Sequence, residues 1–335
     1  LEGLPGTWGL DDGVIFTPPE SGPSLSVDGE YPTGPVRIVT GRNQVDADTL
    51  KATAKTGPVN EQPLLAIDSS ALGGMYAGAI RLVGTEDGVG VKLAGDMAAS
   101  AGDIQIDANG QLTLARVAAS HDLNIKAGEI RAEQQAYAGQ DLSVQSGFIE
   151  NAGELLAGKS IVLSTPQLDN AGLIEAGVAA DAQANTRGTV AIQAERVYNR
   201  GAILAGQELK LQAVNLDNSS GAIASGTAAS IELSDTFKNT TGQIAANNLQ
   251  ITAVQLNNDT GMILADQDMQ LTVAEQLLNR ADGEIASGRK LELTAGQLNN
   301  EGGFLSSDGQ LQLEANQLRN NRQAVLSAEK ALDIT

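Results

Sequence analysis

Cysteine is absent from this chain of 335 residues, so disulfides, thiolate catalysis and cysteine-ligated metals are excluded. Aromatic residues make up only 3% of the sequence, although hydrophobic residues reach 41%. The apolar material is therefore mostly small and aliphatic, which suits a narrow stack better than a globular core. No apolar run approaches the roughly 18–20 residues that a membrane-spanning helix needs.

Basic residues are also scarce. The chain has 21 Lys and Arg against 41 Asp and Glu, a net charge of −20 and a pI near 4.3. Because nucleic-acid affinity depends on neutralising phosphates with Lys and Arg, we expect no nucleic-acid partner. The same acidity disfavours anionic membrane surfaces. No signal peptide opens the chain, and it stops inside a repeat, so we expect a mature protein or a fragment of a longer one.

Proline is nearly absent after residue 63, because eight of the nine prolines lie within residues 1–63. Such a density breaks central strands and leaves edge strands, turns and loops. Strand-like runs remain at residues 13–16, 24–27 and 36–40. We interpret residues 1–63 as the first, irregular coils of the repeat architecture described next, with loops that leave it and cover its end.

Asparagine, in contrast, recurs regularly through the second half of the chain. The gaps between successive copies are 19, 29, 19, 21, 19, 21, 21 and 20 residues, at Asn151, Asn170, Asn199, Asn218, Asn239, Asn258, Asn279, Asn300 and Asn320. An apolar residue stands two positions before every one of them. Self-similarity at a fixed period identifies a repeat protein.

Each repeat contains three short runs in which apolar and other residues alternate: apolar-x-Asn, Gly-x-Ile-x-Ala and Leu-x-Leu-x-Ala. Period two is the strand signal, and no 3.6-residue stripe is long enough for a helix. Three strands within about 20 residues fit one turn of a coil that stacks on its neighbours. The pattern predicts an all-β parallel β-solenoid whose interior is a column of Leu, Ile, Val and Ala.

The asparagines are the candidate structural residues of this fold. An Asn side chain offers an acceptor and two donors on a short arm, so at a tight corner it can bond to its own backbone or to the Asn of the next coil. A glycine follows most copies two to four residues later, and we expect it to supply a positive φ at the corner. The last copy, Asn320, lacks that glycine.

One gap, from Asn170 to Asn199, is ten residues longer than its neighbours. It predicts an insertion at about residues 178–187. Solenoids tolerate such insertions as loops that leave the stack, and some of these loops bind partners.

A family resemblance rests on three segments in the first third of the chain. These are residues 36–46 (VRIVTGRNQVD), residues 73–76 (GGMY) and residues 85–91 (TEDGVGV). They resemble the later part of the secretion domain of two-partner-secretion exoproteins, the filamentous-haemagglutinin-like proteins of Gram-negative bacteria. That group includes adhesins and contact-dependent growth-inhibition toxins of the CdiA type. The Asn-Gly repeats after residue 149 resemble the haemagglutinin repeats of the same proteins.

The resemblance implies a right-handed parallel β-helix, secreted through an outer-membrane partner transporter and displayed on the cell surface. It divides the chain into the later part of a secretion domain, residues 1–95, and a haemagglutinin-repeat shaft, residues 96–335. The family's Asn-Pro-Asn-Gly type secretion signature is absent here. Recognition by the transporter is therefore expected to lie in a segment outside this sequence, and we expect the protein to be a monomer.

Four motifs suggest chemistry, but each has a structural explanation. Residues 153–160 match the phosphate-loop pattern GxxxxGKS, yet the same eight positions recur at 201–208 without Lys and Ser. His121, the single histidine, lies between Ser120 and Asp122, and adjacency in sequence does not build a catalytic triad. Three of the recurring asparagines, Asn218, Asn239 and Asn258, stand in N-glycosylation patterns, but we expect their side chains to be engaged at the corners. Asp46, Asp48, Glu86 and Asp87 lack a Ca²⁺-loop spacing.

The sequence therefore predicts a structural protein without catalytic, cofactor or metal residues. We expect the shaft of a secreted adhesin or of a CdiA-type toxin, which presents a distal segment to a receptor or glycan on other cells. Two alternatives stay open. One is a polysaccharide-active β-helix enzyme, which the shortage of aromatics for sugar stacking disfavours. The other is a carbohydrate- or receptor-binding adhesin module that acts through the loops of residues 1–63.

Overall fold

The computed structural model describes residues 14–16, 25–26, 29–30, 35–41, 43–46, 52–54, 64–69, 74–179 and 187–335. Every regular element among these residues is a β-strand, which confirms the predicted all-β class. The chain divides into an N-terminal unit, residues 1–158, and a C-terminal unit, residues 159–335. In the part of the chain that the structure describes, no helix is long and apolar enough to cross a membrane.

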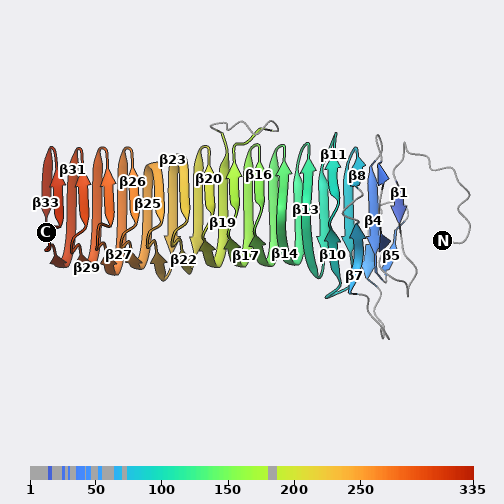
Figure 1. Cartoon of the computed structure of the whole chain (residues 1–335), viewed down its shortest axis with the longest axis horizontal. Helices are drawn as coiled ribbons and strands as arrows, with labels where there is room; N and C mark the ends of the chain where they lie inside the picture. The colour runs from blue at the N-terminus through green and yellow to red at the C-terminus, as the bar shows by residue number, and fades with distance from the viewer. Residues whose placement is uncertain are drawn as a thin grey trace, which may run out of the picture. The chain divides into compact units, whose positions relative to one another are not determined.

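The described residues of the N-terminal unit form the strands β1 to β16 (Figure 1). They are β1 (Val14–Phe16), β2 (Leu25–Ser26), β3 (Gly29–Glu30), β4 (Val36–Thr40), β5 (Asn43–Val45), β6 (Ala52–Ala54), β7 (Leu65–Ser69), β8 (Gly74–Ala77), β9 (Ile80–Gly84), β10 (Gly90–Leu93), β11 (Asp96–Ala99), β12 (Ile104–Ala108), β13 (Gln111–Ala119), β14 (Leu123–Ala138), β15 (Asp141–Asn151) and β16 (Glu154–Ala157).

The C-terminal unit contains the remaining strands, drawn from green to red in Figure 1. They are β17 (Ser160–Asn170), β18 (Leu173–Ala176), β19 (Thr189–Asn199), β20 (Ala202–Ala205), β21 (Glu208–Ala213), β22 (Asn215–Asp217), β23 (Ala222–Leu233), β24 (Thr236–Lys238), β25 (Gln243–Asn257), β26 (Met262–Ala265), β27 (Asp268–Leu278), β28 (Glu284–Ser287), β29 (Lys290–Asn299), β30 (Phe304–Ser307), β31 (Gln310–Arg319), β32 (Val325–Ala328) and β33 (Ala331–Ile334).

Each unit is a parallel β-solenoid, as the alternating runs predicted. In the N-terminal unit, β10, β11 and β12 pair in parallel with β7, β8 and β9 of the coil before. In the C-terminal unit the partners lie about one repeat apart, since Leu209 pairs with Ala229, Ala229 with Leu249, and Leu249 with Met269. Each coil thus hydrogen-bonds to the next through its backbone, and successive coils are stacked at roughly 4.8 Å.

The strands are longer than the three short runs predicted for each coil. β23, for example, joins the Gly-x-Ile-x-Ala run of its coil to the Leu-x-Leu run that follows. Its pairing with β25 shifts register between Ser225 and Ala228, and β25 shifts against β27 between Ala253 and Gln255. The chain therefore turns some corners by an irregularity inside a continuous strand, because the coil-to-coil hydrogen bonds resume on both sides.

The proline-rich N-terminal region supplies the first coil. β1 pairs in parallel with β4, β2 with β7 and β3 with β8, so the predicted strand runs do belong to the solenoid. β5 and β6 form a separate two-stranded antiparallel sheet. Trp8 and all the N-terminal prolines except Pro35 lie outside the described residues.

The core follows from the alternation of inward and outward side chains. The residue two positions before each recurring asparagine is at most 1% exposed from Ile149 to Leu298. Phe237 is the largest of these side chains. Leu318, in β31, is 36% exposed. The long gap between Asn170 and Asn199 does not disturb the stack, because β17 pairs with β19 and β18 with β20 without a shift. Residues 180–186 of the predicted insertion lie outside the described residues.

Candidate functional site

The recurring asparagines form a continuous hydrogen-bonded column inside the C-terminal unit. Each Nδ2 donates to the Oδ1 of the asparagine one coil further on. The donor–acceptor distances are 2.7 Å for Asn170–Asn199, 2.7 Å for Asn199–Asn218, 2.8 Å for Asn218–Asn239, 2.7 Å for Asn239–Asn258, 2.8 Å for Asn258–Asn279, 2.7 Å for Asn279–Asn300 and 2.8 Å for Asn300–Asn320. We call this column the asparagine ladder.

The second Nδ2 proton of these asparagines bonds to the backbone of a corner. Asn258 donates to the carbonyl of Gly261 in its own turn and to that of Glu284 in the next coil, both at 3.1 Å. The Asn258 backbone carbonyl in turn accepts from the amide of Gly261 at 3.1 Å. The side chain is completely buried, and such an amide is tolerated inside a protein only when its donors and acceptor are paired.

The two ends of the predicted series differ from its middle. Asn151 is completely buried in the N-terminal unit. Asn320 is exposed; it accepts from Asn300 and donates to the carbonyl of Ala324 at 3.5 Å. No glycine follows it at the corner, where Arg322 and Gln323 adopt φ values of 53° and 66°.

The glycine after each asparagine has a different role from the one that we expected. Positive φ falls on the residues before it, such as Thr241 and Thr260, both at 55°, whereas Gly242 and Gly261 are not in that region. A Cβ on Gly261 would lie 2.1 Å from the Asn239 carbonyl oxygen and 2.6 Å from Asn258 Oδ1. The expectation of a positive φ is therefore wrong for these glycines, which are needed because two coils and the ladder meet there.

The corners also carry ion pairs between neighbouring coils. The Arg280 guanidinium donates to both carboxylate oxygens of Asp259, with Nη2 at 2.6 Å from Oδ2. These hydrogen bonds raise the pKa of Arg280. Arg289 pairs in the same way with Asp268, and its hydrogen bonds lower the pKa of that carboxyl. Both pairs join one coil to the next on the outside of the solenoid.

The residues that suggested chemistry are not assembled into sites. Residues 154–157 form β16 and Ser160 opens β17, so the GxxxxGKS pattern is not followed by the helix that a phosphate loop requires. His121 is exposed. The Ser120 hydroxyl donates to the Gly102 carbonyl, and the Asp122 carboxylate accepts from the backbone amide of Asp141.

The glycosylation and metal patterns also lack an accessible site. Asn218, Asn239 and Asn258 are completely buried in the ladder, out of reach of a glycosylating enzyme. Within the described residues, no three His, Cys, Asp or Glu side chains gather as metal ligands. Asp48 lies outside those residues.

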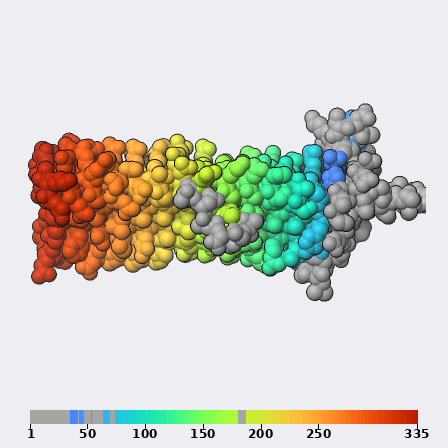
Figure 2. Space-filling view, turned by 90° about the horizontal axis from the view of Figure 1, so that it is seen from above, coloured from blue at the N-terminus to red at the C-terminus, as the bar shows by residue number. Residues whose placement is uncertain are grey.

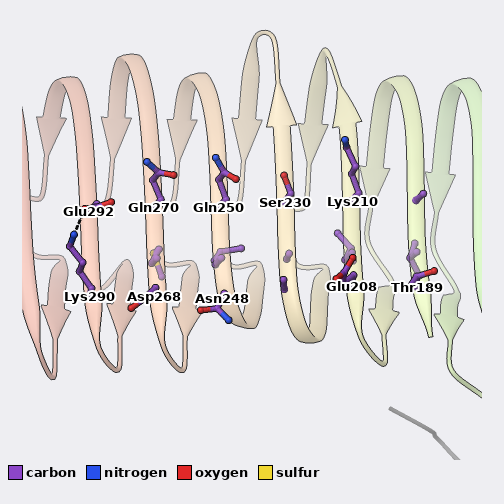
Figure 3. Close-up of a pocket in the computed structure, with 17 residues that line it drawn as sticks. Thr189, Glu208, Lys210, Ser230, Asn248, Gln250, Asp268, Gln270, Lys290 and Glu292 are labelled. Carbon is purple, nitrogen blue, oxygen red and sulfur yellow. Dashed lines mark hydrogen bonds and ion pairs between the residues drawn. The ribbon is translucent and has the colours of Figure 1, made fainter. Parts of the chain in front are cut away.

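A groove on the outer face of the C-terminal unit was not anticipated from the sequence. It has a volume of about 680 Å³ and crosses the strands from β19 to β29. Its lining includes outward side chains that lie in register on successive coils, among them Lys210, Ser230, Gln250 and Gln270 (Figure 3). The signal that could have revealed it is the outward position between the two leucines of each Leu-x-Leu run.

Comparison with known families identifies the repeats. The TPS secretion domain model matches residues 21–114. The haemagglutinin repeat model matches residues 117–194, 171–241, 239–281 and 270–335, which together cover more than half of the chain. The chain belongs to the haemagglutinin-repeat family. A two-partner-secretion domain followed by these repeats marks an exoprotein that is secreted through the outer membrane to the cell surface, as the resemblance predicted.

Several curated CdiA proteins are similar to parts of this chain. The tRNA nuclease CdiA-2 of Burkholderia pseudomallei is 54% identical over 81 residues, which cover 24% of this chain and 2% of that protein. The toxin CdiA of Yersinia pestis is 53% identical over 77 residues, or 23% of this chain and 2% of that protein. The tRNA nuclease CdiA of Yersinia mollaretii is 39% identical over 102 residues, or 29% of this chain and 3% of that protein. No solved structure matches the chain significantly.

The chain thus corresponds to a very small part of the relatives it matches. A haemagglutinin-repeat solenoid fits a structural role.

Proposed function

We propose that this chain is a structural shaft segment of a secreted, cell-surface exoprotein of the filamentous-haemagglutinin and CdiA type. It presents a distal segment of the whole protein to other cells, either as an adhesin or as the stalk of a growth-inhibition toxin. The observation that carries the proposal is the parallel coil stack within each unit, in which backbone pairing joins each coil to the next. Such a stack sets the distance between its two ends, and it needs no reaction centre to do so.

The proposed partners follow from the family rather than from contacts in the structure. An outer-membrane transporter would recognise a segment upstream of the residues present here. A receptor or glycan on the target cell would be met by other regions of the whole protein. The chain itself would carry no catalytic centre, would bind no nucleic acid and would act as a monomer, with the secretion domain ending near residue 95 and the shaft beginning at residue 96.

The asparagine ladder is the proposed stabilising device of that shaft. Each buried asparagine from Asn170 to Asn300 donates a hydrogen bond to the asparagine of the next coil, so the ladder ties neighbouring corners together. Amides in such a chain polarise one another in the low-dielectric interior. The ladder would therefore keep the corners aligned over many coils.

A duplication in the repeat region tests the shaft. The register places Leu209, Ala229 and Leu249 on successive coils, so a second copy of residues 209–248 adds two complete coils and keeps every groove residue. Expressed within the full-length protein, it should leave secretion and surface display intact. The purified chain should lengthen by about 10 Å in small-angle scattering, two strand spacings.

The matched control duplicates residues 209–238, which breaks the register by half a coil. It should impair folding and display. If the two duplications behave alike, or if the in-register duplication adds no length, the chain does not act as a spacer of stacked coils.

No observation favours the polysaccharide-active enzyme. Release of saccharide from acidic polysaccharides by the purified chain would nevertheless overturn the structural proposal. The adhesin module in residues 1–63 falls mostly outside the described residues.

A further inference from the structure

The groove on the C-terminal unit has two rows of outward side chains. In one row Lys210 is paired in register with Ser230, Ser230 with Gln250, and Gln250 with Gln270. In the other row Glu208 is in register with Ala228, and Ala228 with Asn248. Figure 3 shows the two rows side by side along the stacking direction. Equivalent groups therefore repeat at one strand spacing, roughly 4.8 Å.

The polar groups of the first row are available to a ligand. Lys210, Gln250 and Gln270 are exposed, and none of them bonds to another side chain in the described part of the C-terminal unit. Amide groups donate and accept hydrogen bonds, and an ammonium group donates three. A row of this kind can both donate hydrogen bonds to hydroxyl groups and accept hydrogen bonds from them.

The charges along the groove cancel. Asp268 is paired with Arg289, and Lys290 with Glu292. Of the charged lining residues, this leaves one carboxylate, Glu208, and one ammonium, Lys210. A groove with balanced charge inside a chain of net charge −20 does not attract polyanions, since those are bound by surplus Lys and Arg. It suits an uncharged ligand.

The shape of the groove selects an elongated ligand that lies across the strands. Ala228 and Ser230 hold small side chains at its centre, so the space above the sheet stays open between larger neighbours. A volume of about 680 Å³ lies within the ordinary range for small-ligand sites. An extended peptide would instead pair with the edge of a sheet, whereas this groove runs over a face.

We propose that the groove formed by Lys210, Ser230, Gln250, Gln270, Glu208 and Asn248 binds an uncharged, extended β-linked polysaccharide chain. The sugar chain lies along the stacking direction, and each coil meets successive hydroxyl groups with one amide, hydroxyl or ammonium group. No aromatic side chain lines the groove, so each site binds weakly, and many copies on a cell surface give avidity. This activity goes beyond the spacer role and does not depend on it.

The experiment uses the whole chain and defined oligosaccharides. Binding of cellohexaose and N-acetylchitohexaose is measured by saturation-transfer NMR and calorimetry, with a heparin hexasaccharide as the charged comparison. The groove variant combines Lys210→Ala, Gln250→Ala and Gln270→Ala. It should bind at least about tenfold more weakly, because three sets of modest hydrogen bonds are lost. Ser230→Arg, which fills the centre of the groove, should do the same.

The matched control changes a second row of exposed side chains on the same unit. Gln276, Gln297 and Gln317 lie in register on β27, β29 and β31 and outside the groove. Their triple alanine variant should bind the uncharged oligosaccharides as the wild type does. The proposal is overturned if neither uncharged oligosaccharide binds the wild type, if the groove variant binds equally well, or if the heparin hexasaccharide binds more tightly.

Discussion

At the ladder corners from Asn218 to Asn300, asparagine and glycine have complementary roles. The asparagine brings a buried amide that bonds to both neighbouring coils, and the glycine leaves room for it. Thr260 and Gly261 illustrate the consequence: the threonine takes the left-handed conformation while the glycine takes the crowded position. A β-branched residue with positive φ is uncommon, so packing of the backbone rather than torsional preference decides which residue is glycine.

Replacing Asn258 by alanine should lower the free energy of unfolding by about 2–3 kcal/mol. The change removes the donor to Asn279 Oδ1 and the acceptor for Asn239 Nδ2, and unpaired buried polar groups each cost about 1–3 kcal/mol. Urea denaturation followed by circular dichroism measures the effect. The control Asn316→Ala changes an exposed asparagine outside the ladder and should stay within about 0.5 kcal/mol of the wild type. Equal effects would show that the ladder adds no stability.

Adjacent substitutions at one corner should have opposite signs. Gly261→Ala places a Cβ 2.1 Å from the Asn239 carbonyl oxygen, so we expect destabilisation of about 1–3 kcal/mol, as for other overpacked sites. Thr260→Asn relieves a left-handed threonine by up to about 1 kcal/mol, because asparagine visits that region readily. Thermal unfolding of both variants measures the sign of each stability change. A stabilising Gly261→Ala would mean that the close approach of the two coils is not required.

Most of the strands could be predicted from the sequence, because the alternation of apolar and other residues indicates which side chains face inward. The runs around Leu209, Leu249 and Leu291 are strands, and their partners are one repeat apart. The joined strand β23 was missed, since continuity through a corner depends on pairing with the neighbouring coils. The groove was also missed: outward residues have no periodic constraint, so Lys210 and Gln250 look like ordinary surface residues until register aligns them.

The ion pair between Asp268 of β27 and Arg289 of the following coil should be visible in a titration of the Asp268 carboxyl. Hydrogen bonds from Arg289 lower the pKa of Asp268, so its favourable interaction is complete above the ordinary carboxyl pKa and is lost as the pH falls through the lowered value. Carboxyl NMR should show the Asp268 pKa rising towards 3.8 in Arg289→Gln. An unchanged Asp268 pKa would refute the pairing.

At the scale of the whole molecule, the net negative charge of the surface lowers the stability of the repeat fold. Acidic residues exceed basic ones by 41 to 21, and the solenoid core holds almost none of them. Figure 2 shows the coils of the C-terminal unit closely packed in chain order from green to red, so charged side chains on neighbouring coils lie near one another. Stability along each unit depends on contacts between neighbouring coils, and like charges on those neighbours repel.

Added salt should therefore stabilise the protein. Between about 10 mM and 150 mM NaCl the Debye length falls from about 30 Å to about 8 Å, which screens the repulsion of a chain with net charge −20 more in the compact state than in the unfolded one. Salt also weakens the exposed pairs, such as Arg116–Asp96 and Arg131–Glu150, but pairs of this kind contribute only about 0–1 kcal/mol each. We expect the urea midpoint to rise with NaCl, which is preferred to sulfate because sulfate strengthens apolar burial as well. A falling midpoint would show that attractive pairs, not net repulsion, dominate the surface.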